Sequence, residues 1–339
     1  MSQEIIETLV RKAFEEAEES VSFSFQGGEP TLAGLEFFKN FINLVSIYKK
    51  LKIGVHFSIQ TNGTKLDTQW CDFFRNYNFL VGLSLDGLQK FHDSARRDTQ
   101  GNPTYQVVTS SYHMLRGKKV DVNILCVVTG RMTRLGERVY KELKQMGCHH
   151  IQFIPCLDPV GAPKGDTSFS LSPESYSYFL KTIFDLWYKD WRNGSYCSIR
   201  LFDDHVRILA GLEPSSCATA GRCGNYAVVE SDGSIFPCDF YVVNEWKIGN
   251  ITKSSFAEIL ESSTAVEFIQ HSQRPAKCSV CKWSSICRGG CKKDWVFTES
   301  GVENYYCQTF KDFFEYAYNR LKIVAEAERY AQKTVGYYN

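Results

Sequence analysis

The sequence predicts an α/β fold in which a parallel sheet covered by helices is followed by a cysteine-rich region. Segments with strand-like and helix-like spacing alternate over the first half of the 339 residues, which is typical of βαβ units. The strand-like segment 123–128 is almost continuously apolar, as expected for a strand that helices cover on both faces. In addition, eight of the 13 cysteines crowd into residues 217–307.

The predicted strands span residues 21–25, 53–60, 79–85, 120–129 and 151–155, and the predicted helices around them span 1–20, 35–51, 67–76, 105–116 and 133–146. Polar or glycine-rich segments occur at the ends of three strands: GGEP at 27–30, TNG at 61–63 and SLDG at 84–87. Barrel enzymes build their active sites at the rim where the carboxyl ends of parallel strands meet. We therefore expect the functional site at this rim.

A long helix at 173–191 leaves the alternating pattern, and the cysteine-rich region follows it. Within that region, residues 227–230 and 235–238 predict a hairpin around a turn at Asp232-Gly233. A helix over about 310–331 closes the chain. The change in cysteine content after the long helix is the first sign of a second domain.

The composition argues against several classes of partner. Hydrophobic residues make up 43% and charged residues 23%, and the net charge of +1 gives no basis for a nucleic-acid or membrane surface. No apolar run is long enough to span a bilayer. The acidic, helix-periodic N-terminus is not a signal peptide, so we expect a cytoplasmic protein. Thiols stay reduced there, and dense cysteines then favour metal ligation over disulfides.

The spacing of the clustered cysteines predicts two iron–sulfur clusters. These residues are Cys217, Cys223, Cys238, Cys278, Cys281, Cys287, Cys291 and Cys307. A cluster needs four thiolates around a compact core, and the C-x2-C and C-x3-C turns place several sulfurs on one side of a loop. Structural zinc is the alternative, because C-x2-C also begins zinc sites built from four cysteines.

Several longer segments carry a family resemblance. They are FQGGEPTLAGLEFF at 25–38, IQTNG at 59–63, FLVGLSLDG at 79–87, NILCVVT at 123–129, FDLWY at 184–188, VVESDGSIFPCDFYV at 228–242 and NYYCQ at 304–308. The cysteine spacing resembles the SPASM domain of radical S-adenosylmethionine enzymes. Over about residues 4–330, the chain resembles the anaerobic sulfatase-maturating enzymes. The resemblance implies a partial (β/α)6 radical-SAM-type barrel over 1–190 that lacks its first strand, a linking helix over 191–212, and a SPASM domain with a C-terminal helix over 213–339.

The resemblance also implies a binding site for S-adenosylmethionine. The residues it points to are Gln26, Gly27, Gly28, Glu29, Ser84 and Arg96. Glycines let the backbone approach a ligand closely, and a glutamate suits the ligand's ammonium group. Arginine can grip the ligand's carboxylate with its planar fork. A plain turn before a helix and a solvated surface arginine are the structural alternatives.

By the same resemblance, Asp239 is the base that deprotonates the target side chain. In the family, a 5′-deoxyadenosyl radical removes a Cβ hydrogen from a cysteine or serine of a sulfatase, which becomes Cα-formylglycine. The remaining electron leaves through two auxiliary [4Fe–4S] clusters. One is implied on Cys217, Cys223, Cys238 and Cys291, and the other on Cys278, Cys281, Cys287 and Cys307. The implied partners are a sulfatase polypeptide and a reduced flavodoxin or ferredoxin-type electron donor.

Two other functions stay open on the sequence alone. Another SPASM enzyme that modifies a ribosomal peptide would share the clusters, but it would not necessarily use Asp239. A non-catalytic protein that binds clusters or zinc would need only the cysteines.

One family motif is absent from the 339 residues. Radical S-adenosylmethionine chemistry needs a third [4Fe–4S] cluster on a C-x3-C-x2-C motif, whereas Cys287-x3-Cys291 is followed by Asp294. We expect that the segment with the family's first strand and this motif was removed by truncation or a misplaced start; loss of the catalytic cluster is the alternative. Without that segment, the strand at 21–25 has an unpaired edge.

The absent motif gives a first prediction. A purified polypeptide of residues 1–339 is expected not to cleave S-adenosylmethionine, because it lacks the three thiolates that hold a cluster with one open iron. Anaerobic incubation with a strong reductant, followed by chromatographic detection of 5′-deoxyadenosine, measures this activity. Product formation by the 339-residue polypeptide would contradict the expectation.

Overall fold

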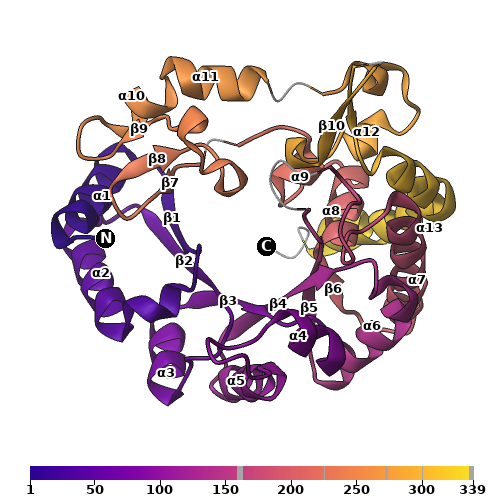
Figure 1. The fold of residues 1–339 in the computed structure, drawn as a ribbon, viewed down its shortest axis with the longest axis horizontal. Coiled ribbons are helices and arrows are strands. Elements are labelled where there is room, and N and C mark those ends of the chain that lie inside the picture. Colours follow the sequence, from indigo (N-terminus) through magenta and orange to yellow (C-terminus); the bar gives the residue numbers. More distant parts are fainter. Residues whose placement is uncertain (159–162, 225, 272–273, 300, 336–339) are drawn as a thin grey trace. The chain divides into compact units, whose positions relative to one another are not determined.

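The computed structural model describes residues 1–158, 163–224, 226–271, 274–299 and 301–335 (Figure 1). Residues 336–339, the end of the predicted SPASM domain, lie outside the described residues. The chain divides into two compact units. Unit 1 contains residues 1–83, 107–122 and 223–273, and unit 2 contains residues 84–106, 123–222 and 274–339.

Six strands form one sheet in chain order, which confirms the predicted α/β class. They are β1 (Ser20–Phe25), β2 (Gly54–Thr61), β3 (Phe79–Ser84), β4 (Asp121–Val128), β5 (His150–Pro155) and β6 (Ser198–Ile199). The pairs β1–β2, β2–β3, β4–β5 and β5–β6 are all parallel. The sequence predicted the first five strands. Strand β6 has two residues, which is too short to give a periodic pattern.

Helices precede, separate and follow these strands along the chain. They are α1 (Gln3–Glu16), η1 (Pro30–Ala33), α2 (Leu35–Tyr48), α3 (Thr68–Asn76), α4 (Gln89–Ala95), α5 (Tyr105–Gly117), η2 (Thr133–Leu135), α6 (Gly136–Gln145), α7 (Pro173–Arg192) and α8 (Arg200–Leu209). The predicted linking segment 191–212 contains the end of α7, strand β6 and α8. Helix α7 ends because Asn193 caps it and Gly194 takes the left-handed conformation with φ of +70°.

A core of aliphatic and aromatic side chains in unit 1 lies between the helices α1 and α2 and the strands β1 and β2. Helices α1 and α2 lie side by side in Figure 1 and contact each other. Phe25 meets Phe41 edge-on with ring centres 5.0 Å apart, and Phe57 stacks on Phe79 at 5.1 Å. This packing fixes the two strands whose ends carry the GGEP and TNG segments.

Unit 1 also contains the predicted hairpin. Its elements are β7 (Val228–Val229), β8 (Ser234–Phe236), η3 (Asp239–Tyr241), η4 (Asn244–Trp246), β9 (Gly249–Asn250), α10 (Phe256–Leu260) and α11 (Ser263–Gln270). Strands β7 and β8 pair antiparallel, which confirms the hairpin. Helix α1 holds this region: Lys12 donates to the carbonyls of Ile251 and Ser254, and Glu16 accepts the first N–H groups of α10.

The rest of unit 2 consists of short elements followed by one long helix. They are α9 (Cys217–Ala220), η5 (Ala276–Val280), α12 (Ser284–Cys287), η6 (Lys292–Asp294), β10 (Trp295–Thr298), β11 (Gly301–Asn304) and α13 (Cys307–Val335). Helix α13 packs on α7 and α8. Phe313 contacts the rings of Phe184 and Phe202 at 5.6 and 5.5 Å, and all three are buried.

None of the helices in the described ranges combines the length and the apolar character that crossing a membrane requires.

Candidate functional site

The GGEP segment forms a loop that requires glycine at two positions. Gly27 and Gly28 have φ values of +88° and +48°, a region that other residues rarely adopt. A Cβ atom built on either residue would meet no atom within 4 Å. The glycines are therefore required by the path of the backbone rather than by crowding, and the loop keeps open space beside it that a ligand can enter.

Glu29 ties this loop to the end of β2. Its Oε1 accepts hydrogen bonds from the N–H and hydroxyl of Thr31 (3.1 and 2.7 Å) and from the hydroxyl of Thr61 (2.7 Å). Its Oε2 accepts the N–H of Asn62 at 2.7 Å. The GGEP and TNG motifs are thus one hydrogen-bonded unit. These four bonds use most of the capacity of the carboxylate, and the contact of Glu29 with an ammonium group stays a prediction.

The carboxylate of Asp239 is held by Gln26 within unit 1. Gln26 Nε2 donates to Asp239 Oδ2 at 2.8 Å, although 213 residues separate the two. The Sγ of Cys238 lies 3.5 Å from Asp239 Oδ1. Both Gln26 and Asp239 are exposed. A carboxylate oriented through one oxygen keeps lone pairs on the other for a proton, which is what a base needs.

Arg96 forms a two-point ion pair with Asp86 just beyond the end of β3. Its Nε lies 2.6 Å from Oδ2, and its Nη2 lies 3.2 Å from Oδ1. Asp86 is buried and also accepts the N–H of Val127 in β4 at 2.8 Å. Ser84, which is half-buried, lies two residues before Asp86. The ion pair uses Nε and Nη2, so a ligand carboxylate would have to bind through Nη1, and this contact stays a prediction.

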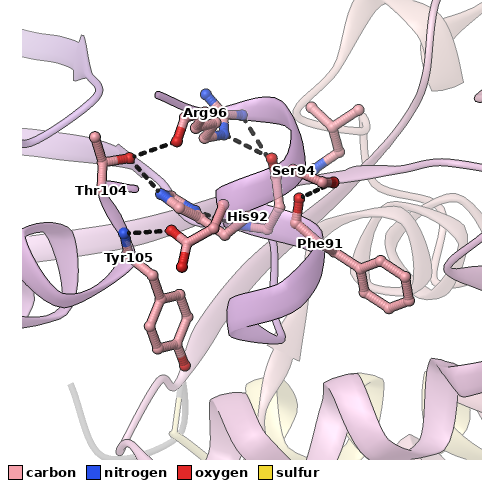
Figure 2. A network of polar contacts seen from close by, with 9 residues as sticks. Phe91, His92, Ser94, Arg96, Thr104 and Tyr105 are labelled. Carbon is pink, nitrogen blue, oxygen red and sulfur yellow. Dashed lines mark hydrogen bonds and ion pairs between the residues drawn. The ribbon is translucent and has the colours of Figure 1, made fainter. Parts of the chain in front are cut away.

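A buried histidine holds the segment that carries Arg96 (Figure 2). His92 Nδ1 accepts the N–H of Asp86 at 3.3 Å. The hydroxyl of Thr104 donates to the carbonyl of Arg96 at 2.9 Å, so it accepts from His92 Nε2–H at 3.1 Å. Burial lowers the pKa of His92, while the charge of Asp86 opposes this shift and that of Arg96 adds to it. The imidazole is therefore neutral and acts as a fixed donor and acceptor.

Four of the clustered thiols line one pocket in unit 2. They are Cys278 and Cys281, at and after η5, Cys287 at the end of α12, and Cys307 at the start of α13. Trp283, Gly289 and Phe314 line the same pocket. Burial, followed by the nearby thiols of Cys307, Cys278 and Cys281, raises the pKa of Cys287 to about 11, against a hydrogen bond from the N–H of Gly289.

The donor set of this pocket fits a four-iron cluster. All four cysteines are free thiols, and they come together from three separate elements. Over the described ranges, no three His, Cys, Asp or Glu side chains lie close enough together to hold one metal ion. On a [4Fe–4S] cluster each thiolate binds a different iron, so its four ligands need not converge on one point. Four cysteine thiols around one pocket are the ligand set that a [4Fe–4S] cluster requires.

The other four clustered cysteines are divided between the two units. Cys217 and Cys291 both belong to unit 2, and Cys223 and Cys238 belong to unit 1. Burial raises the pKa of Cys291 to about 12, and the nearby thiol of Cys217 adds to this shift. The ligand set of all four stays a prediction.

Sequence reasoning missed three polar features of these sites. It assigned Gln26 to the cofactor, without the contact to Asp239. It predicted no role for Asp86 of the SLDG motif and none for Asp204, a buried carboxylate on α8. The partners lie 10 residues away for Asp86 with Arg96, 11 for Asp204 with Ser215 and 213 for Gln26 with Asp239, beyond the period of a single helix or strand, so no local pattern carries the signal.

Two segments of the chain match known families. Residues 217–283 match SPASM, described as an iron–sulfur cluster-binding domain. Residues 1–134 match the radical SAM superfamily.

Curated relatives and solved structures agree with these matches. A cysteine-type anaerobic sulfatase-maturating enzyme of Clostridium novyi (strain NT) is 43% identical, over 98% of this chain and 90% of that protein. A serine-type anaerobic sulfatase-maturating enzyme of Bacteroides thetaiotaomicron is 31% identical, over 93% of this chain and 80% of that protein. A solved structure described as native anSMEcpe with bound AdoMet and Kp18Cys peptide matches with a TM-score of 0.93 and 44% identity, covering 96% of this chain and 91% of that chain.

The resemblance of the motifs is thus confirmed by similarity along almost the whole chain. This chain belongs to the family of anaerobic sulfatase-maturating enzymes, which are radical SAM oxidoreductases with a SPASM domain that binds [4Fe–4S] clusters.

Proposed function

We propose that this protein oxidises an active-site cysteine or serine of a sulfatase to Cα-formylglycine. The observation that carries the proposal is the 43% identity, over 98% of the chain, to the cysteine-type enzyme of C. novyi. The peptide and AdoMet bound in the anSMEcpe structure support a polypeptide substrate and S-adenosylmethionine as its co-substrate here. A reduced flavodoxin or ferredoxin-type protein in the cytoplasm is the proposed electron source.

The overall change removes two electrons from the target side chain. A hydrogen atom leaves Cβ, a proton leaves the thiol or hydroxyl, and one electron follows, so that the C–S or C–O single bond becomes C=S or C=O. Where the target is cysteine, water then replaces the sulfur, giving the aldehyde and hydrogen sulfide. When bound, S-adenosylmethionine and the clusters supply the hydrogen-atom abstraction and the path for the electron.

Asp239 is the proposed base that takes the thiol or hydroxyl proton. It follows Cys238, a proposed cluster ligand, and so lies on a segment that ligation would fix in place. The hydrogen bond from Gln26 restricts the rotation of its carboxylate. A base must hold such a fixed direction to reach its proton. Gln26 is therefore proposed to orient Asp239, in addition to its predicted place beside the cofactor.

The proposed cofactor contacts stay with the residues predicted from the sequence. The open backbone at Gly27 and Gly28 supports contacts to S-adenosylmethionine. Glu29, Ser84 and Arg96, whose Nη1 is not used by the ion pair with Asp86, are the other proposed contacts. The four-thiol pocket supports one auxiliary cluster. Cys217, Cys223, Cys238 and Cys291 are the proposed ligands of the other.

Modification of a ribosomal peptide, the alternative considered from the sequence, is not favoured. The Streptococcus suis SuiB structure with bound precursor peptide SuiA shares 17% identity with this chain, at a TM-score of 0.58, and so supports the common fold alone. The relatives that share 43% identity over nearly the whole chain are sulfatase-maturating enzymes.

Replacing the proposed base tests the mechanism. In a chain extended by a relative's C-x3-C-x2-C segment, Asp239→Asn is expected to lower kcat for peptide oxidation by about 10²- to 10⁴-fold, because the proton acceptor is lost. Gln26→Ala should lower it by about 10- to 150-fold, since a hydrogen bond to a charged group contributes about 1.5–3 kcal/mol. Mass spectrometry of the peptide product measures both effects.

Glu245→Gln provides a matched control, because Glu245 is an exposed carboxylate six positions beyond Asp239. Its rate should stay unchanged. Cleavage of S-adenosylmethionine should persist in Asp239→Asn, since the acid–base step comes after it. Full formylglycine formation by Asp239→Asn would remove this residue from the mechanism.

The choice between target residues gives a further prediction. Identity is 43% to the cysteine-type relative and 31% to the serine-type relative, so we expect a preference for cysteine. Two peptides that differ only in cysteine or serine at the target position, assayed in competition, should give the larger kcat/KM for cysteine. Equal values, or a larger value for serine, would contradict this preference.

A further inference from the structure

We propose that Asp204, a buried carboxylate on α8, is the positioning residue that fixes Cys217 as a cluster ligand. It acts by holding the loop on both sides of that cysteine. The inference rests on the proposed ligand role of Cys217, and it adds a residue that has no direct contact with the metal.

Both carboxylate oxygens of Asp204 accept hydrogen bonds from this loop. Its Oδ1 accepts the N–H and the hydroxyl of Ser215 at 2.7 and 2.8 Å, and its Oδ2 accepts the hydroxyl of Thr219 at 2.6 Å. Ser215 precedes Cys217 by two residues, and Thr219 follows it by two. One carboxylate therefore clamps the loop at both sides of the thiol.

The burial of Asp204 makes the loss of these hydrogen bonds costly. Asp204 is 1% exposed, and no ion pair with it is found in the part of the chain that the structure describes. A buried carboxylate without a paired cation is costly unless hydrogen bonds satisfy it. The loop supplies those bonds, so moving the loop would leave a buried charge unsatisfied. The burial of the carboxylate therefore favours the loop conformation that places Cys217.

Arg200 strengthens the same arrangement from the first turn of α8. Its Nε donates to the hydroxyl oxygen of Ser215 at 3.2 Å, and its Nη2 donates to the carbonyl of Ser215 at 3.1 Å. Ser215 thus accepts from Arg200 while it donates to Asp204. Helix α8 holds this residue at its backbone and its side chain, immediately before the cysteine helix α9 begins.

The far end of the loop is fixed by close packing against the second cysteine segment. Gly221 ends α9 with φ of +63°, and a Cβ there would lie 2.1 Å from the carbonyl oxygen of Arg288. Arg288 stands between Cys287 and Cys291. Cys217 is therefore held by α8 on one side and by the segment that carries Cys291 on the other. Helix α8 and this segment both belong to unit 2, so contacts within one unit of the protein position Cys217 and Cys291.

The adjacent residue offers a matched control. Asp203 also lies on α8 and also accepts two hydroxyl groups, those of Tyr196 and Ser198. These partners precede α8 and do not belong to the cysteine loop. Asp203→Asn therefore makes the same chemical change on the same helix without touching the clamp.

The experiment compares anaerobically reconstituted 339-residue chains by iron and sulfide content and by electron paramagnetic resonance after reduction. Cys217→Ala shows the loss of iron and the spectral change that follow from losing this ligand. Asp204→Asn is expected to reproduce both, while Asp203→Asn keeps the iron content and the spectrum of the unaltered chain. Full iron with an unchanged spectrum in Asp204→Asn overturns the proposal. An equal loss in Asp203→Asn overturns it as well, because a general weakening of α8 would then be the cause.

A second pair of variants covers the case in which Asp204→Asn does not fold. Thr219→Ser keeps the hydroxyl that reaches Asp204, and Thr219→Val removes it at nearly the same size. Circular dichroism checks that both are folded. Iron content should fall in Thr219→Val and stay full in Thr219→Ser, and equal iron in the two overturns the proposal. None of these readouts requires sulfatase maturation. They therefore decide the role of Asp204 even if the proposed function is wrong.

Discussion

The convergence of Cys278, Cys281, Cys287 and Cys307 on one pocket is the constraint on which the last part of the chain depends. Cys278 lies in η5, which has five residues, and Cys287 ends α12, which has four; the strands of the following hairpin have four residues each. Helices this short are not stable alone, and Ile286 and Tyr306 are among the few apolar side chains buried in this stretch. A cluster on the four thiols cross-links residues 278 to 307, and binding free energy then becomes folding free energy.

The motifs at the strand ends act through hydrogen bonds to one another. Glu29 of GGEP binds Thr61 and Asn62 of TNG, so two motifs that are distant in the sequence fix one loop. Asp86 of SLDG pairs with Arg96 and accepts the N–H of Val127, which joins a second strand end to the next. These carboxylates orient the groups around them. A residue in such a motif can therefore serve the site without touching the ligand, as is proposed for Asp204 beside Cys217.

The sequence predicted the parallel sheet and most of its helices, because apolar strands and periodic helices carry their signal within a few residues. It missed helix α4 and strand β6. Strand β6 has only two residues, which give no periodic pattern. It identified the cysteines by spacing, yet the convergence of Cys307 with Cys278 is a property of the fold. The contacts of Gln26 with Asp239 and of Asp204 with Thr219 join residues whose pairing depends on tertiary packing. Local periodicity contains no information about such pairs.

The binding of two four-iron clusters by eight thiolates is the central proposal for this protein. Its most direct test is the iron, sulfide and zinc content of the anaerobically reconstituted 339-residue chain, measured together with its Mössbauer spectrum. Two [4Fe–4S] clusters predict about eight iron and about eight sulfide per chain, with the spectrum of four-iron clusters and no stoichiometric zinc. A colourless chain without iron, or one with zinc in place of iron and sulfide, would contradict the account.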